Sequence, residues 1–233
     1  MRESQTRKFD SDDPDVLAAY QAETNGDFLR AIDYYKKAID RNPDLGIVHK
    51  HLGNVHYRLG MLEEATHHLE EAVKLLPEYP TARYELAMAY YRHARIKDAI
   101  DTMLIVLDLD RDFLMAHYWL GILHYHYGDL YRSREFYTYV TQKRPDFTIA
   151  YFHLGVVNLR LGYYEDSVDN FQKIIEKNPE SPAAYALIGD AYLNLDRKYD
   201  ARKAYKKALS LDPNDHKARN GLAAVEDFGG VNF

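Results

Sequence analysis

The chain has 233 residues and no cysteine, and its 30 Lys and Arg against 36 Asp and Glu leave a net charge of −6. The lack of cysteine excludes disulfides, thiolate metal sites and cysteine nucleophiles, and the acidic balance argues against non-specific binding to nucleic acid or anionic membranes. No stretch approaches the roughly 18 apolar residues of a membrane span, and the polar start lacks the apolar core of a signal peptide. We therefore expect a cytoplasmic protein, free or peripheral to a membrane-bound assembly.

The N-terminal segment predicts a flexible tail followed by a helix pair. Residues 1–11 are polar with mixed charges. Two aspartates and a proline follow at positions 12–14, where an acidic cap and a first-turn proline favour the start of a helix. An Asn-Gly-Asp turn then separates two predicted helices at about 13–24 and 28–40.

From this pair onward the chain repeats itself every 34 residues. All repeats but one close on a proline, which cannot continue a helix. Arg111 occupies the closing position in the remaining repeat. The closing prolines are Pro43, Pro77, Pro145, Pro179 and Pro213. The gaps between them are 34, 68, 34 and 34 residues, so the period runs without an insertion or deletion.

Three further positions recur in the same phase. A small residue allows two helices to approach closely, and glycine supplies the left-handed turn after a helix. The small residue of the first helix is Ala19, Gly53, Ala87, Gly121, Gly155 or Gly189. Its counterpart in the second helix is Ala31, Ala65, Ala99, Ser133, Ser167 or Ala201. The turn position is Gly26, Gly60, Ala94, Gly128, Gly162 or Asp196.

The unit at 182–215 shows why the copies must stack. Its first helix places two tyrosines, Tyr185 and Tyr192, on one apolar face, and Tyr205 lies on the apolar face of its second helix. Neither short helix can bury its apolar face alone, so each unit packs against the next. Residues 216–227 begin one more first helix without a second, which predicts a capping helix, and 228–233 are expected to be a flexible tail.

This pattern resembles the tetratricopeptide repeat (TPR) family. The resemblance implies an all-α fold, a right-handed superhelical solenoid of antiparallel helix pairs with six repeats and a C-terminal capping helix. The repeats are 12–45, 46–79, 80–113, 114–147, 148–181 and 182–215. The tryptophan usual in the family's first helix is replaced by Asp15, His49, Arg83, His117, Tyr151 and Tyr185.

The third repeat departs most from the pattern. Its turn position is Ala94, for which a left-handed conformation costs about 1–2 kcal/mol, and its closing proline is replaced by Arg111. We predict that the junction between the third and fourth repeats is the softest joint of the solenoid. The alternative is that the missing proline changes nothing.

Catalytic and metal-binding signals fail on spacing. His49 and His56 are seven residues apart, as are His117 and His124, and two helical turns rise about 10.5 Å, too far for one metal ion. Phosphate-binding, nucleophile-elbow and HExxH motifs are absent. We therefore expect no enzymatic activity, no cofactor and no metal.

The resemblance implies that the first helices line a concave groove, where ligands bind. Met88, Ile122 and Val156 occupy a groove position that is commonly asparagine in the family, and Trp119 is the only tryptophan. An exposed apolar and aromatic patch of this kind indicates a binding site. The predicted groove residues are Lys50, Asn54, Arg58, Tyr84, Met88, Tyr91, Arg92, Tyr118, Trp119, Ile122, Tyr125, His126, Phe152, Val156 and Arg160.

One known ligand mode of the family is not matched. The clamp that holds chaperone C-terminal carboxylates needs a Lys and Asn, then an Asn, then two basic residues in successive repeats. Lys50 and Asn54 fit, but Glu85 stands in place of the second asparagine, and Met115 and Trp119 in place of the basic pair. Chaperone tails are therefore not expected partners.

These observations favour a protein-protein interaction adaptor or scaffold that binds a peptide or helix with apolar anchors and acidic flanks. The alternative is a self-assembling scaffold in which the tail around Phe9 enters the groove of another copy. Bacterial scaffolds that coat magnetosomes are similar, although nothing in the sequence singles out that subgroup. Arginines interleaved with tyrosines allow RNA binding as a third reading, which the net negative charge disfavours.

Overall fold

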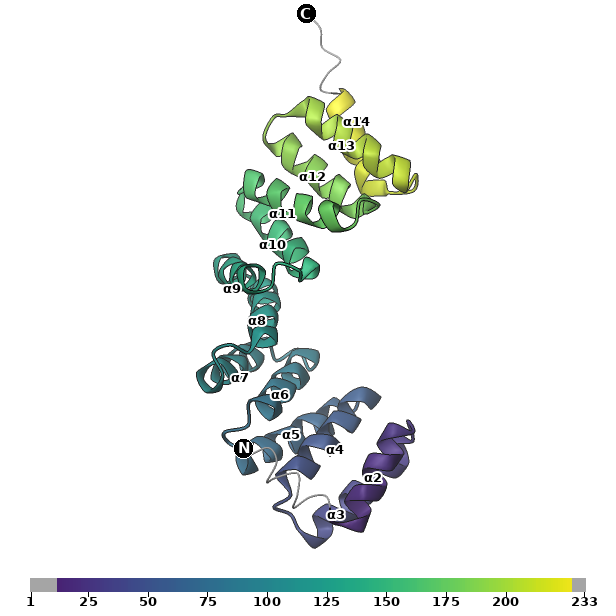
Figure 1. Cartoon of the computed structure of the whole chain (residues 1–233), viewed down its shortest axis with the longest axis vertical. Coiled ribbons are helices and arrows are strands. Elements are labelled where there is room, and N and C mark those ends of the chain that lie inside the picture. The colour runs from purple at the N-terminus through teal and green to yellow at the C-terminus, as the bar shows by residue number, and fades with distance from the viewer. Residues whose placement is uncertain (1–11, 228–233) are drawn as a thin grey trace, which may run out of the picture. The chain divides into compact units, whose positions relative to one another are not determined.

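The computed structural model describes residues 12–227, so the flexible tails expected at 1–11 and 228–233 lie outside this range. Within it the chain is all-α, with 13 helices and no strand (Figure 1). The helices are α2 (Pro14–Thr24), α3 (Phe28–Arg41), α4 (Gly46–Leu59), α5 (Leu62–Leu75), α6 (Pro80–Arg92), α7 (Ile96–Leu109), α8 (Leu114–Tyr127), α9 (Leu130–Lys143), α10 (Thr148–Leu161), α11 (Tyr164–Lys177), α12 (Pro182–Asn194), α13 (Lys198–Leu211) and α14 (His216–Asp227).

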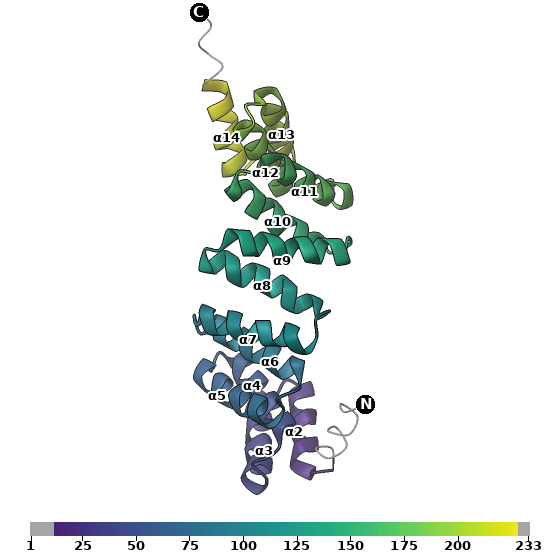
Figure 2. The same ribbon diagram turned by 90° about the vertical axis from the view of Figure 1, so that its left-hand side faces the viewer.

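The described residues form two compact units that divide between Ala116 and His117. In the first, α2, α4 and α6 each pack against the helix that follows, and α3 and α5 pack against the next pair (Figure 2). In the second, α10 and α12 pair with α11 and α13, and α9, α11 and α13 contact the helix after them. The predicted architecture of consecutive antiparallel helix pairs, closed by the single helix α14, is confirmed.

The turn inside every helix pair is left-handed, as the sequence predicts. Residues with positive φ at these turns are Gly26 (77°), Gly60 (78°), Ala94 (59°), Gly128 (94°), Gly162 (83°) and Asp196 (56°). The amide after each turn residue donates back into the first helix, as in the bond of 2.8 Å from Arg95 N to Tyr90 O. One residue of reversed φ therefore ends the first helix and starts the second.

Small and large residues alternate where the paired helices touch. A Cβ added at Gly121 would lie 2.7 Å from the Tyr137 ring, and one added at Gly155 would lie 2.8 Å from the Phe171 ring. Tyr137 and Phe171 are completely or almost completely buried. The glycine on one helix thus provides the space that the aromatic ring on the other fills, at the packing density of a protein core.

Serine replaces alanine at the small second-helix position in two repeats of the second unit. Its buried hydroxyl donates to the carbonyl of the facing glycine, from Ser133 Oγ to Gly121 O at 2.7 Å and from Ser167 Oγ to Gly155 O at 2.9 Å. These bonds satisfy hydroxyls that burial would otherwise penalise, and they hold α8 against α9 and α10 against α11.

The last repeat is covered by α14, which contacts α12 and α13. Tyr205 of α13 is completely buried, with its ring against the backbone of Gly189 on α12 and Gly221 on α14. Its hydroxyl donates to Asp190 at 2.8 Å, and Lys217 of α14 lies 2.7 Å from the other oxygen of that carboxylate. Helix α14 is thereby attached by packing and by an ion pair.

Two structural features, a membrane-spanning helix and a metal-binding cluster, are not found in residues 12–227. None of the helices there combines the length and apolar content that crossing a bilayer requires. Nor does that part of the chain bring three or more His, Asp or Glu side chains close enough together to hold a metal ion.

Candidate interaction site on the first helices

In the first unit, several polar side chains on the first helices are paired with one another. Lys50 Nζ lies 3.4 Å from Glu85 Oε1, and both side chains are largely buried. Glu85, which departs from the chaperone clamp, therefore neutralises the lysine that would hold a ligand carboxylate. The partly buried Asn54 lies one turn beyond Lys50 on α4.

A second paired group joins the first two repeats. Tyr35 donates to Glu23 Oε2 at 2.8 Å, and His51 Nδ1 lies 3.4 Å from the same oxygen. Burial alone would raise the pKa of Glu23, but the hydrogen bonds from His51 and Tyr35 outweigh it and lower that pKa. Glu23 is therefore ionised at neutral pH and engaged within the protein.

The third repeat adds side chains of intermediate exposure. Tyr84, Met88 and Tyr91 of α6 are all partly exposed. The ring of Tyr84 packs against Phe113, with centroids 5.4 Å apart. Met88 is therefore accessible from solvent, flanked by tyrosines on the turns before and after it.

The three predicted groove arginines pack over aromatic rings. Arg58 lies over Phe28 at 4.3 Å, Arg92 over Tyr57 at 4.5 Å and Arg160 over Tyr125 at 4.8 Å. Arg92 also donates to the Tyr57 carbonyl at 2.8 Å. In all three pairs the arginine belongs to the repeat after that of its ring, so the contact joins neighbouring repeats through a cation-π interaction.

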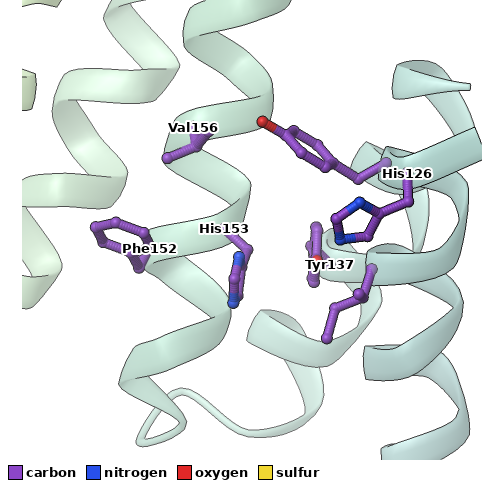
Figure 3. Close-up of a pocket in the computed structure, with 7 residues that line it drawn as sticks. His126, Tyr137, Phe152, His153 and Val156 are labelled. Carbon is purple, nitrogen blue, oxygen red and sulfur yellow. The ribbon is translucent and has the colours of Figure 1, made fainter. Parts of the chain in front are cut away.

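In the second unit, the first helices α8 and α10 enclose a pocket with a volume of about 250 Å³ (Figure 3). We call it the α8–α10 pocket. Its walls are mainly apolar or aromatic and come from three helices. Its lining residues are Ile122, Tyr125 and His126 from α8, Tyr137 from α9, and Phe152, His153 and Val156 from α10.

His153 lies at the centre of the aromatic contacts around this pocket (Figure 3). Its ring stacks on Tyr137 with centroids 5.3 Å apart and an interplanar angle of 10°, and it meets Phe152 edge to face at 5.8 Å. Burial lowers the pKa of His153, and the neighbouring His126 lowers it further. His153 is therefore neutral at physiological pH and acts as one more aromatic wall.

The structure brings part of the predicted set together. Ile122, Tyr125, His126, Phe152 and Val156 all line the α8–α10 pocket. Two other predicted residues adjoin it: Tyr118 contacts the His153 ring, and Arg160 covers Tyr125. Trp119 in turn contacts Tyr118. The predicted residues that belong to the first unit are Lys50, Asn54, Arg58, Tyr84, Met88, Tyr91 and Arg92.

Two lining residues were missed by the sequence prediction. His153 follows Phe152 directly and lies on the predicted groove face, so its position in the repeat was the available signal. Tyr137 belongs to a second helix, where an aromatic residue in phase with Phe171 and Tyr205 indicates core. No pattern in one repeat shows that the edge of a core ring reaches a pocket formed with the next repeat.

Stacked helix hairpins with a partly exposed aromatic row on their first helices define a helical-repeat scaffold for protein-protein interaction. Family models described as "Tetratricopeptide repeat" match residues 17–45 and 182–215, 84–146, and 149–181, and a model described as "TPR repeat" matches 53–93. These segments together cover most of the chain. The chain belongs to the tetratricopeptide repeat family.

Solved structures with the same fold are distant in sequence. YrrB, described as "a TPR protein with an unusual peptide-binding site", is 20% identical with a TM-score of 0.74, covering 81% of this chain and 97% of YrrB. A MamA structure is 22% identical with a TM-score of 0.69, covering 74% and 94%. The C-terminal part of a TPR repeat-containing protein from Cytophaga hutchinsonii is 16% identical with a TM-score of 0.76, covering 91% and 85%. A comparison with curated proteins finds no match.

Proposed function

We propose that this protein is a non-catalytic adaptor that binds a peptide or helix of a partner protein across its first helices. The observation that carries the proposal is the α8–α10 pocket, an apolar and aromatic hollow at positions where the family binds ligands. Interface hot spots concentrate in such pockets and are enriched in tryptophan, tyrosine and arginine. Trp119, Tyr125 and Arg160 supply those residue types here.

The contrast between the two units supports this assignment. In the first unit, polar first-helix side chains lie against one another: Lys50 Nζ is 3.4 Å from Glu85 Oε1, and His51 Nδ1 is 3.4 Å from Glu23 Oε2. The α8–α10 pocket has apolar walls with no internal side chain filling it. Covering an apolar surface that is open to water is favourable, so this surface favours association with a partner.

Partner capture with matched variants tests the proposal. Trp119→Ala and Met88→Glu alter partly exposed first-helix residues, whereas Tyr131→Ala removes an exposed tyrosine from the second helix α9. Proteins that bind wild type and Tyr131→Ala but neither of the other two are the expected ligands. For a purified ligand, Trp119→Ala should weaken binding by at least about 2 kcal/mol. An unchanged affinity in both first-helix variants would remove the groove from consideration.

Self-assembly is the alternative function, and it places the segment around Phe9 in the groove of a second copy. Residues 1–11 lie outside the described part of the chain. Mass measurement of the full chain and of a variant without residues 1–11 separates the two functions. Oligomers lost on truncation favour self-assembly, and a monomer in both cases favours the adaptor.

A further inference from the structure

The charge distribution around the α8–α10 pocket carries a more specific inference, which rests on the function proposed above. We infer that this pocket accepts one large apolar side chain from a partner segment that carries an aspartate or glutamate beside it. The partner is therefore an acidic protein segment with an aromatic or aliphatic anchor. The same argument disfavours a basic segment, because these two helices offer it no carboxylate.

The apolar anchor follows from the walls of the pocket. Ile122, Phe152 and Val156 are hydrocarbon surfaces, and Tyr125 and Tyr137 add ring faces. A volume of about 250 Å³ accommodates a single large side chain and excludes a folded element. A charged group inserted there would lose its hydration without finding an opposite charge on the lining residues.

The acidic neighbour follows from the two first helices, which supply six of the seven lining residues. The sequences of α8 and α10, LMAHYWLGILHYHY and TIAYFHLGVVNLRL, contain no aspartate or glutamate, and Arg160 is their only arginine or lysine. The first helices that hold the pocket thus offer no carboxylate to a basic partner.

Arg160 is placed to receive a carboxylate next to the anchor. It follows Val156 by one helical turn, so the two side chains share a face of α10, and its guanidinium lies over Tyr125, which lines the pocket. Arg160 is exposed and has no carboxylate partner within residues 12–227. Asp190, the acidic residue of the next first helix α12, is engaged by Tyr205 and Lys217.

A phage-displayed library of random dodecapeptides, selected on the full-length protein, tests the inference without a known ligand. The expected consensus is a large apolar residue with an aspartate or glutamate within a few positions. The best peptide is then synthesised and its affinity measured by fluorescence polarisation against wild type, Val156→Trp, Ile122→Ala, Arg160→Ala and Trp119→Ala. Tyr131→Ala is the control, and thermal melting of each variant checks that it folds.

Val156→Trp fills the pocket and should weaken the peptide at least tenfold, because the anchor loses its place. Ile122→Ala opens one wall and should weaken it in the same direction, which covers the case in which the tryptophan variant does not fold. Arg160→Ala should cost about two- to fivefold, since an exposed ion pair contributes little. That loss should disappear with a peptide in which lysine replaces the acidic residue.

The outcomes separate the inference from the function on which it rests. Peptides that bind Val156→Trp and Ile122→Ala as tightly as wild type but are weakened by Trp119→Ala would overturn the pocket and leave the groove function standing. A consensus rich in lysine or arginine would overturn the charge argument. Peptides indifferent to all these first-helix variants would overturn both.

Discussion

The Nδ1 atoms of His49 on α4 and His68 on α5 lie 3.2 Å apart, so one of the two rings must donate and the other accept. His49 Nε2 lies 3.2 Å from the carbonyl oxygen of Pro43, which can only accept. His49 therefore carries its proton on Nε2, and His68 donates from Nδ1. Protonating His49 would place two protons between the rings, so this contact requires a neutral His49.

The second repeat should lose stability in mild acid for this reason. Burial lowers the pKa of His49 and of His56, and burial with His49, His56, His67 and Lys36 nearby lowers the pKa of His68 to about 3. Glu71 opposes the shift at His49 and Glu64 opposes it at His56. In the unfolded chain these histidines have pKa values near 6.5. Below that pH the unfolded chain therefore binds more protons than the folded protein, and the free energy of unfolding falls as the pH drops toward the folded pKa values.

We expect a loss on the order of 1 kcal/mol between pH 7 and pH 5 after allowing for solvent screening. Urea denaturation at both pH values measures it. His68→Leu should reduce the pH dependence, whereas His216→Asn, which changes an exposed histidine on α14, should leave it intact. Equal pH dependence in wild type and His68→Leu would show that the cluster is not responsible.

Arg134 of α9 joins the fourth repeat to the fifth. Its Nε donates to Asn158 Oδ1 at 2.7 Å, its Nη2 lies 2.8 Å from Asp166, and its guanidinium covers Tyr163. Asn158 is only 2% exposed. Arg134→Ala leaves that buried amide oxygen without its donor, so we expect a loss of about 1–3 kcal/mol in unfolding free energy.

The neighbouring Arg132 provides the control. It lies on the same helix, and the ion pair of its side chain is with Asp129 at 3.6 Å, with 61% of the side chain exposed. Arg132→Ala should change stability by less than about 0.5 kcal/mol. Denaturant unfolding of the two variants under one set of conditions makes the comparison, and similar losses would show that Arg134 is an ordinary surface residue.

These contacts mark the limit of what the repeat pattern predicts. The left-handed turns and the glycine beside Tyr137 follow from the sequence because they depend on one helix pair, whose residues recur in phase. The bond from Arg134 to Asn158 and the pair of Lys50 with Glu85 depend on how one repeat packs against the next. That geometry is set by many side chains together, so no single position signals it.

For the candidate site too, the sequence predicts what depends on a residue's position within one repeat, but not what depends on the packing between repeats. Val156 and Phe152 could be placed on the ligand-facing side from their position in the repeat. The participation of Tyr137 and the pairing of Lys50 could not, because each needs the orientation of a neighbouring repeat. The softness predicted for the junction after the third repeat stays a prediction, although the chain divides into compact units close to it, at Ala116.

Attachment of the capping helix should depend on Gly221. A Cβ at this position would overlap the ring of Tyr205, which is completely buried and fixed on its other side by Gly189, where an added Cβ would lie 2.5 Å from the ring. Gly221→Ala gains about 1 kcal/mol of helix propensity, but overpacking costs about 1–3 kcal/mol. We expect a net loss of stability, concentrated in faster amide exchange of α14.

Asn220→Ala is the matched control for this variant. It alters the neighbouring exposed residue of the same helix and should be neutral or slightly stabilising. Hydrogen exchange resolved along the chain distinguishes local detachment from global unfolding. If exchange of α14 in Gly221→Ala matches that in Asn220→Ala, the ring of Tyr205 has room to move and the close packing is not limiting.

The third repeat should gain stability from Ala94→Gly. Ala94 adopts φ of 59° at the turn between α6 and α7, where four of the other five repeats have glycine. Releasing a left-handed alanine relieves about 1–2 kcal/mol, and the greater freedom of glycine in the unfolded chain takes back about 0.4–1 kcal/mol. The expected net gain is roughly 0.5–1 kcal/mol in unfolding free energy, measured with denaturant.

Asp196→Gly separates relief of strain from a general effect of glycine. Asp196 has nearly the same φ, 56°, but aspartate tolerates this region better than alanine because its side chain can bond locally. The gain from Asp196→Gly should therefore be smaller than that from Ala94→Gly, or absent. A loss in both variants would mean that the entropy of the unfolded chain outweighs the strain, and that these two turns are not weak points of the repeat array.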